Sequence, residues 1–416
     1  MAAAPNLIRM LDASVLRETL NAHMQYIHGR PGGRRANLSY CDLSERSLEG
    51  ADLSHAELTG ARLSGALMAR TKLDRAVLFG CDLRNADLRE ASLVKADLRG
   101  ACLRGANLSG ADLAGCDLRE GRIALADPKA GLRILKHEKR PGELDDAILS
   151  GANLAGAQMS GTLAQAADFT NANLSHAVLT GARLAKATLD GADLSGADLA
   201  QADMRGVSMR RAVLAGVDRN KVNLSTADLT GALDAAPDMV FIDDMPLDEA
   251  VARHQAWCAS DGREGGVLSA ANTDFRPLRT MVGRRLPGLG AAGSIFVGLD
   301  MTGAELQGAD LSNCDLRAVS LKGADLRGAK LMGADLSRAN LRDANLGPLM
   351  VGSDRMLRTD LTRASLRNAD LRGAICWRAR FLEADMAQAR LEGCDLSLAE
   401  LTPPANADIP QIGTAS

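Results

Sequence analysis

The chain has 416 residues, of which 46% are hydrophobic, 24% are charged and only 2% are aromatic. Its 49 Lys and Arg residues nearly balance 52 Asp and Glu residues, and the net charge of −3 excludes a molecule built as a polyanion or a polycation. The composition is too apolar for a disordered chain, and the lack of an unbroken apolar run of about 18 residues excludes a membrane-spanning helix.

The first predicted element is an amphipathic helix over residues 7–28. Its apolar residues recur at spacings of three and four, and Leu7, Leu11 and Leu20 are among them. A stretch rich in glycine and proline begins at Gly29 and ends the helix. Because charged residues interrupt this segment every few positions, it does not have the apolar core of a secretory signal.

The chain then follows a period of five residues. From Leu38 to Ile123, all 18 positions spaced by five are Leu, Met or Ile. A small residue, most often Ala, stands two positions before each of them except Leu48, which Arg46 precedes. The residue in between is usually polar, such as Asp52 or Asn107. The repeating unit is therefore A-[D/N]-L-x-x, and a repeat of this kind is the sequence signature of a stacked architecture.

Two further runs repeat the same unit in other registers. One has 17 positions from Leu149 to Leu229, interrupted only by Ala164 and Arg219. The other has 22 positions from Phe296 to Leu401 and stays in register throughout. Near Pro348, however, the small residue that should stand two positions before the large one is missing. Because the registers of the three runs differ, we expect insertions between them.

A period of five matches neither an α-helix nor a flat strand. It does match a chain that turns a corner once in each repeat, so that every Leu and every Ala points to a common axis. Four corners close a coil of about 20 residues, and stacked coils pair their backbones at about 4.8 Å. Columns of Leu and Ala leave no room for aromatic rings, which explains the 2% aromatic content.

The A-[D/N]-L-x-x units resemble those of the pentapeptide-repeat family, and the resemblance covers 57 repeats in the three runs. It implies an all-β solenoid, a right-handed quadrilateral β-helix. We expect short α-helical caps on this solenoid, since its end coils otherwise expose unpaired backbone. The family's fold does not by itself define a function.

A second helical cap is indicated by a sequence pattern that occurs twice in the chain. His23-x-x-Tyr26 is followed by two adjacent glycines, and His254-x-x-Trp257 is followed by another such pair. We infer a duplication of a unit made of a helical cap and a solenoid. The predicted segments are an N-terminal helical cap (1–35), a first solenoid run (36–123), a basic insertion loop (124–148), a second run (149–233), a second cap with an acidic segment, a helix and a basic glycine-rich loop (234–295), a third run (296–401) and a flexible tail (402–416).

Function is expected on loops that the repeats do not dictate. Residues 122–140 and 276–287 are basic, whereas residues 238–249 are acidic. A basic loop can meet phosphate or an acidic partner, although loops in water are also commonly charged for solubility alone. The candidate partner-binding residues are Lys129, Arg133, Lys136, Lys139, Arg140, Arg279, Arg284 and Arg285.

No residues are predicted to be catalytic, to bind a cofactor or to bind a metal. Most cysteines occupy the small position where Ala is usual, and no CxxC motif is present. The six histidines are scattered without convergent partners. A GxGxxG match at 288–293 lacks the strand–turn–helix context of a dinucleotide site, so we interpret it as a flexible loop.

The sequence therefore predicts a non-enzymatic, cytoplasmic scaffold or regulator that binds a protein partner. One alternative is a modulator of a nucleic-acid enzyme such as a DNA gyrase or another topoisomerase. The resemblance to the pentapeptide-repeat family implies it, since members of that family inhibit DNA gyrase. Mimicry of DNA disagrees with the mixed surface charge, and a nucleic-acid partner is not expected. The other alternative is a bacterial effector. The partner and the oligomeric state stay open.

Overall fold

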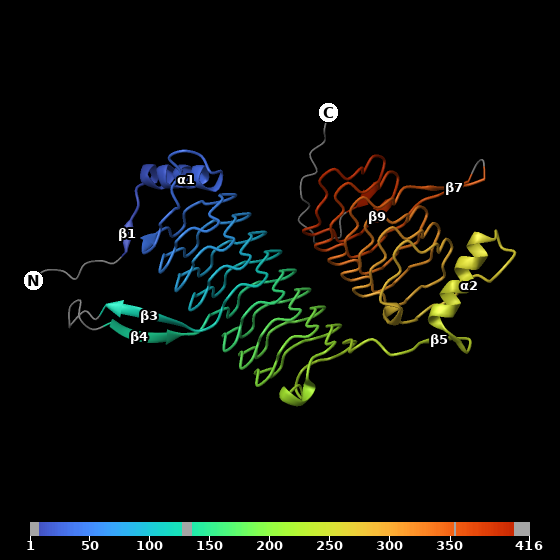
Figure 1. Cartoon of the computed structure of the whole chain (residues 1–416), viewed down its shortest axis with the longest axis horizontal. Helices are drawn as coiled ribbons and strands as arrows, with labels where there is room; N and C mark the ends of the chain where they lie inside the picture. The colour runs from blue at the N-terminus through green and yellow to red at the C-terminus, as the bar shows by residue number, and fades with distance from the viewer. Residues whose placement is uncertain (1–7, 127–134, 353–354, 403–416) are drawn as a thin grey trace, which may run out of the picture. The chain divides into compact units, whose positions relative to one another are not determined.

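The chain forms two compact units, Met1–Ala235 and Ala236–Ser416. The computed structural model describes residues 8–126, 135–352 and 355–402. In each unit a short helix precedes a stack of coils (Figure 1). Each unit is described separately below.

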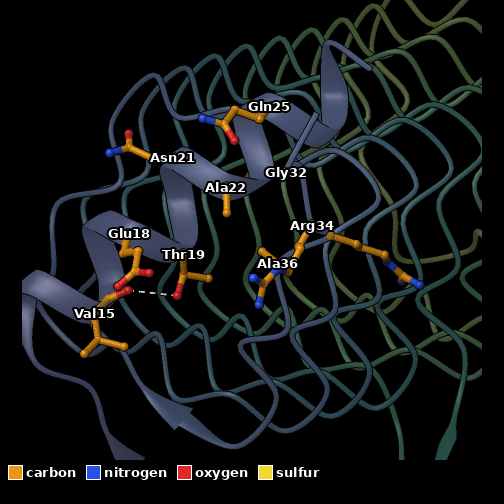
Figure 2. A pocket seen from close by; sticks show the side chains of 10 residues that line it. Val15, Glu18, Thr19, Asn21, Ala22, Gln25, Gly32, Arg34 and Ala36 are labelled. Atoms are coloured by element: carbon orange, nitrogen blue, oxygen red, sulfur yellow. Dashed lines mark hydrogen bonds between the residues drawn. The ribbon is translucent and has the colours of Figure 1, made fainter. Parts of the chain in front are cut away.

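Helix α1 (Ala13–Ile27) precedes the first stack. Figure 2 shows it lying across the nearest coils. Its side chains Leu16 and His23 are buried, and Leu16 belongs to the same apolar cluster as the coils. Just before the helix, strand β1 (Arg9–Met10) pairs in parallel with β2 (Cys41–Asp42) of the first coil. The N-terminal coil of the first unit is therefore in contact with chain that is not part of the repeats.

Parallel bridges join each coil of the first unit to the next. Asn37 pairs with Glu57 and Glu57 with Val77, so bridged partners are separated by four pentads of sequence. This spacing agrees with the prediction of four pentads per coil. The corner after Leu38 is a turn in which the carbonyl of Leu38 accepts a hydrogen bond from the N–H of Cys41, at 3.1 Å.

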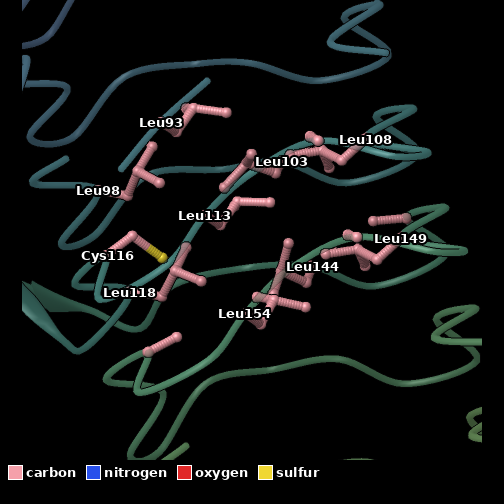
Figure 3. Packing of buried hydrophobic residues seen from close by; sticks show 14 of the residues in the cluster. Leu93, Leu98, Leu103, Leu108, Leu113, Cys116, Leu118, Leu144, Leu149 and Leu154 are labelled. Atoms are coloured by element: carbon pink, nitrogen blue, oxygen red, sulfur yellow. The ribbon is translucent and has the colours of Figure 1, made fainter. Parts of the chain in front are cut away.

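The inward columns form the core. Leu43, Leu63 and Leu83 lie at the same place in successive coils, and each is 0% exposed. The small residues two positions earlier, Cys41, Ala61 and Cys81, are buried as well. Figure 3 shows leucines of neighbouring coils stacked along the interior, with Cys116 among them. Side chains of this size fill most of the tube. The prediction that the columns leave no room for aromatic rings is wrong, because the rings of Phe169, Phe275, Phe296 and Phe381 are 0–1% exposed inside the coils.

A hairpin interrupts the first stack without ending it. Strands β3 (Gly121–Ala126) and β4 (Leu135–Arg140) pair antiparallel and project from the coils (Figure 1). The coil bridges continue across the hairpin, from Cys102 to Glu143 and from Asp117 to Gln158. These partners are separated by the usual four pentads and, in addition, by the inserted segment 121–141.

This corrects two predicted boundaries. The runs 36–123 and 149–233 are one stack, whereas the sequence treats them as separate. Ile123 lies in β3 and not in a coil, and Leu144 already occupies a buried inward position within the predicted loop 124–148. The physical reason is that Gly142 takes the small inward position before Leu144, so that the coil resumes directly after the hairpin.

Gly142 yields a first prediction, because a Cβ at this position would lie 2.1 Å from the carbonyl oxygen of Leu118. We expect Gly142→Ala to lower the free energy of unfolding by about 2 kcal/mol or more, as overpacking of a close backbone contact does. Chemical denaturation checks this. The matched control is Gly290→Ala, whose Cβ would meet its nearest atoms at 3.6 Å. Equal stability of the two variants would contradict the prediction.

Near its C-terminal end the first stack is less regular. The 3-10 helix η2 (Arg219–Lys221) replaces a corner at the break that the sequence shows at Arg219. Val217, Leu224 and Leu229 are only partly buried there. The last coil of the first unit is therefore packed more loosely than those before it.

The second unit opens with a small hairpin and a helix. Strands β5 (Phe241–Ile242) and β6 (Met245–Pro246) pair antiparallel, and α2 (Leu247–Ala259) follows directly. The acidic segment 238–249 is distributed over this hairpin and the first turn of α2. Asp248 and Glu249 are in that turn, where negative charge stabilises a helix.

The second stack begins earlier than predicted. Ser269 pairs with Gly290 and Thr280 with Asp300, so residues from 268 onward already form coils. The interpretation of 234–295 as a cap, with a flexible glycine-rich loop at 288–293, is therefore wrong beyond about residue 267. Within the supposed GxGxxG loop, Gly290 also bridges to Asp310.

Two local irregularities conceal these early coils in the sequence. The inward residues Phe275 and Met281 are six positions apart, and the 3-10 helix η3 (Arg276–Leu278) takes up the extra residue. In the next irregular pentad the sizes are exchanged, because Leu289 fills the small position and Ala291 the large one. The summed volume is kept, which is what packing requires.

A second hairpin interrupts the second stack. Strands β7 (Leu349–Val351) and β8 (Arg355–Leu357) pair antiparallel. The bridge from Lys330 to Asp360 spans six pentads of sequence instead of four, so two pentads are inserted. The predicted run 296–401 keeps its register, but it is not a continuous run of coils. An insertion of whole pentads keeps the period of five, and the register therefore does not reveal it. At the end of the described chain, β9 (Arg380–Leu382) pairs in parallel with β10 (Glu400–Thr402).

The two helices share two contacts, as the predicted duplication requires. Nδ1 of His23 accepts a hydrogen bond from the N–H of Ala36 at 3.0 Å, and Nδ1 of His254 accepts one from the N–H of Leu268 at 2.9 Å. His23 stacks on Tyr26 and His254 on Trp257, each at a ring-centroid distance of 5.8 Å. In both units a neutral histidine fixes the first residues of the stack.

These histidines predict a pH dependence. Burial lowers the pKa of both His23 and His254 below 6.5, so the folded state favours the neutral ring. The stabilisation is complete above pH 6.5 and is lost as the pH falls through the lowered pKa values. We expect the free energy of unfolding to decrease from about pH 7 to about pH 5, above the range where carboxylates titrate. Denaturation at a series of pH values measures this.

The matched variant is the double substitution His23→Asn and His254→Asn. An amide oxygen can accept the same backbone hydrogen bond but does not titrate. This variant should have a flatter profile over the same pH range. A profile as steep as that of the unmodified protein would contradict the assignment.

Candidate interaction surface

The first candidate surface is the β3–β4 hairpin. Six residue pairs hold it together, from Gly121 opposite Arg140 to Ala126 opposite Leu135. Its base is fixed by close backbone contacts, since a Cβ on Gly121 would lie 2.9 Å from the carbonyl oxygen of Arg99. The hairpin therefore leaves the stack at a defined point.

The register places basic residues along this hairpin. Arg122 stands opposite Lys139, and Lys136 stands opposite Leu125. Arg140 is exposed at the base of the hairpin. The other two predicted residues of the segment, Lys129 and Arg133, lie outside the described residues.

The second basic segment is not a projecting loop, which corrects the prediction for Arg279, Arg284 and Arg285. These residues belong to coils of the second stack, and acceptors from elsewhere in the chain bind two of them. Arg284 Nη1 donates to Gln255 Oε1 of α2 at 2.5 Å, and Arg285 Nε lies 3.2 Å from Glu305 Oε2. Arg279 is exposed at the extra residue, with a φ of 58°.

The segment also contains Arg276, whose Nη2 lies 2.7 Å from Asp274 Oδ2. The sequence shows no acid between residues 276 and 287, but the fold supplies acids from the preceding pentad and from the next coil. Two of the four arginines of the segment, Arg276 and Arg285, are thereby paired with an acid.

The faces of both stacks carry a repeated ion pair. In the motif Asp-Leu-Arg, the Arg side chain forms a fork: it donates two hydrogen bonds to the carboxylate of the Asp two residues earlier. Arg84 donates to Asp82 in this way, at 2.7 and 2.6 Å. This arginine lowers the pKa of Asp82 through its hydrogen bonds. The same fork occurs at Asp87–Arg89, Asp97–Arg99, Asp117–Arg119, Asp203–Arg205, Asp325–Arg327 and Asp370–Arg372.

Charges also alternate from coil to coil in the second unit. Lys330 Nζ lies 3.2 Å from Asp310 Oδ2 one coil earlier, and Arg380 Nε lies 3.2 Å from Glu400 Oε2 one coil later. A face with alternating, paired charges does not present the uniform negative field of a nucleic acid. The recurring Asp residues therefore stabilise the stack locally.

The sequence did not indicate a further projecting element, the β7–β8 hairpin. Met350 and Val351 on it are 56% and 44% exposed. Its base packs closely on the stack, since a Cβ on Gly328 would lie 2.8 Å from Cβ of Leu349. The signal that could have revealed it is Pro348, where the small inward residue is missing.

A pocket of about 500 Å³ lies beside α1 (Figure 2). Its lining is mixed: Glu18 and Gln25 come from the helix, and Arg34 and Arg35 from the segment that leads into the first coil. Arg35 is already paired with Glu57 at 3.0 Å. The pocket brings together no acid, base and nucleophile in the arrangement that a catalytic site requires.

Within residues 8–126, 135–352 and 355–402, no group of three or more His, Cys, Asp or Glu side chains is placed to hold a metal ion. No helix in those residues is long and apolar enough to span a membrane.

Stacked coils of four pentads define the chain as a repeat protein with a β-solenoid fold. The family model for pentapeptide repeats matches eight stretches that together cover more than half of the chain. The chain therefore belongs to the pentapeptide-repeat family. The matched stretches are residues 34–68, 71–110, 81–119, 165–199, 192–231, 291–317, 309–347 and 359–397.

Several solved structures of pentapeptide-repeat proteins are similar. HetL, a protein involved in heterocyst differentiation regulation from the cyanobacterium Nostoc sp. strain PCC 7120, is 22% identical, with 95% of this chain and 99% of HetL covered and a TM-score of 0.19. Rfr23 from the cyanobacterium Cyanothece 51142 is 26% identical over 35% of this chain and 89% of Rfr23, with a TM-score of 0.24.

QnrB1, a plasmid-mediated fluoroquinolone resistance protein, is 21% identical in its full-length structure. The match covers 47% of this chain and 83% of QnrB1, with a TM-score of 0.17. Among curated proteins, no significant sequence match is found.

Proposed function

We propose that the protein is a non-enzymatic scaffold that binds an acidic surface of a protein partner through the β3–β4 hairpin. In this proposal the two stacks are right-handed, four-sided β-helices, and α1 and α2 cap their N-terminal ends. The solenoids supply rigidity, and the hairpin supplies the contact.

One observation carries the proposal: the hairpin is inserted into a stack that continues across it. The bridges from Asn107 to Ile148 and from Asp112 to Asn153 are made as if the inserted residues were absent. The core therefore does not depend on the hairpin. An element that projects from a rigid support without stabilising it is free to serve as a binding site.

Charge supports an acidic partner. Arg122, Lys136, Lys139 and Arg140 all lie on the two strands, whereas Glu138 is the one acid on them. Bases on the faces of the solenoid are repeatedly forked onto an Asp of their own pentad. Cations that are grouped on one hairpin attract a complementary patch and accelerate association.

The test is affinity capture with the full-length protein. The bait is compared with a variant in which Lys136, Lys139 and Arg140 are replaced by Gln, and with a control that neutralises Arg205 and Arg210 on the coil faces. We expect a stoichiometric protein partner that the control retains, that the hairpin variant loses, and that salt of about 0.5 M releases.

Equal capture by the hairpin variant would overturn the assignment to this hairpin. Recovery of nucleic acid or of a topoisomerase as the bound species would favour the alternative, a modulator of a nucleic-acid enzyme. A supercoiling assay with purified protein would then replace the capture experiment.

A further inference from the structure

Two cysteines meet near the C-terminal end of the second stack. Cys376 and Cys394 have their Sγ atoms 3.6 Å apart. They belong to successive coils, because Ile375 bridges to Asp395 and the N–H of Cys376 donates to the carbonyl of Asp395 at 2.8 Å. Both occupy inward positions: Cys376 stands where Leu is usual and Cys394 where Ala is usual.

The environments of the two sulfur atoms differ. Cys376 is buried, whereas Cys394 is partly exposed. The hydrogen bond between the sulfurs lowers the pKa of Cys394, and together with burial it raises the pKa of Cys376. The thiol that solvent can reach is thus the one that more readily becomes a thiolate, the nucleophilic form.

Other cysteines of the stacks are placed differently. Cys81 Sγ donates to the carbonyl of Leu58 at 2.9 Å, and Cys314 Sγ donates to the carbonyl of Ala291 at 3.0 Å. Burial raises the pKa of each of these two thiols to about 12. They act as small apolar residues that fill the core.

The place of the pair in the stack gives it a structural consequence. Leu371, one coil before the end, is 0% exposed, whereas Leu391 and Leu396 in the last coil are only partly buried. The described chain ends at Thr402, and no described helix covers this end as α2 covers the other. A covalent link between the two coils would hold the weakest part of the stack.

We propose that Cys376 and Cys394 form a reversible disulfide that links the last coil to the coil before it, with a small-molecule disulfide such as oxidised glutathione as the oxidant. The Cys394 thiolate attacks one sulfur of the oxidant and releases one thiol, which leaves a mixed disulfide. Cys376 then loses its proton and attacks Cys394 Sγ, releasing the second thiol. Two protein thiols are oxidised and one small disulfide is reduced to two thiols.

Closing the bond requires the sulfurs to move from 3.6 Å to about 2.05 Å. The loosely packed last coil can accommodate this movement, whereas coils in the middle of the stack cannot. The link is therefore feasible at this end, and reduction would return the coil to its looser state.

The experiment uses the full-length protein, equilibrated in mixtures of reduced and oxidised glutathione, alkylated and digested. We expect a peptide link between residues 376 and 394 and the loss of two hydrogen atoms in the intact mass. Cys394→Ala, which restores the usual small residue, should abolish the link, and the control Cys314→Ala should retain it. Amide exchange over residues 385–402 should slow at least tenfold on oxidation.

A second variant tests the order of the steps. In Cys376→Ala the resolving thiol is absent, so Cys394 should accumulate a stable mixed disulfide with glutathione. Ala occupies the same kind of inward position at Ala164 and Ala291, so this variant is expected to fold. The proposal is overturned if the link appears only in denaturant, or if Cys376→Ala shows no more modification than the unmodified protein.

Discussion

Phe296→Ala is expected to destabilise the second stack by about 3–5 kcal/mol. Phe275 and Phe296 are stacked in successive coils with ring centroids 4.4 Å apart, and both are 0% exposed. Removing one ring opens a cavity that neighbouring coils cannot fill, because their backbones are fixed by bridges on both sides. The loss includes about 1 kcal/mol from the ring pair itself.

The measurement is chemical denaturation of the full chain, followed by a probe in the second unit. The control is Phe296→Leu, because Leu316 and Leu336 occupy the same column one and two coils further on. This variant should cost less than about 1.5 kcal/mol. If both variants lose the same stability, the ring stack does not contribute as the geometry indicates.

Excision of residues 121–141 should abolish capture of the partner and leave the fold intact. The deletion removes the inserted segment and joins residue 120 to Gly142, so that Leu118 and Leu144 become neighbours in the five-residue period. Since the bridges across the hairpin already exist, the free energy of unfolding should change by no more than about 1 kcal/mol. Circular dichroism and denaturation report the fold, and affinity capture reports the contact.

A deletion of residues 121–143 is the matched control for the register. It removes two more residues, leaves too few for a corner, and should destabilise the first stack strongly. Excision of residues 349–358, the two-pentad insertion with β7 and β8, should leave capture unchanged. A strongly destabilised 121–141 deletion would show that the hairpin supports the core, against the proposal.

The period of five was sufficient to predict the coils. Each pentad carries the same local information: a small residue, a polar residue, a Leu and two residues at a corner. Because the information is local and repeated, the inward columns such as Leu43, Leu63 and Leu83 follow from spacing alone. The duplication of the helical segments was visible for the same kind of reason, in His23 and His254.

The insertions were harder to predict. A register change reveals an insertion only when its length is not a multiple of five, and the β7–β8 hairpin adds two whole pentads. The early coils of the second unit were hidden by one extra residue after Phe275 and by the exchange of sizes at Leu289 and Ala291. In the early coils, packing conserves volume in three dimensions while the sequence pattern is lost.

The candidate interaction surface was likewise predicted only in part from the sequence. The sequence located the basic segment 122–140, and the fold shows that much of it is a hairpin inserted in a continuous stack. For Arg284 and Arg285 the sequence showed only a run of positive charge. Their partners Gln255 and Glu305 lie a full coil or more away along the chain. The packing of α2 brings Gln255 to Arg284, and the stacking of the coils brings Glu305 to Arg285.

The sequence by itself thus determined the coil, its core and the family, because these depend on side-chain size and spacing within each pentad. The tertiary structure decided which runs join into one stack, which bases are neutralised and which cysteines meet. Those relations connect residues that are one coil or more apart in the sequence, such as Cys376 with Cys394 and Cys102 with Glu143. A period of five fixes the direction of each side chain, but only the stacking of the coils fixes its neighbours.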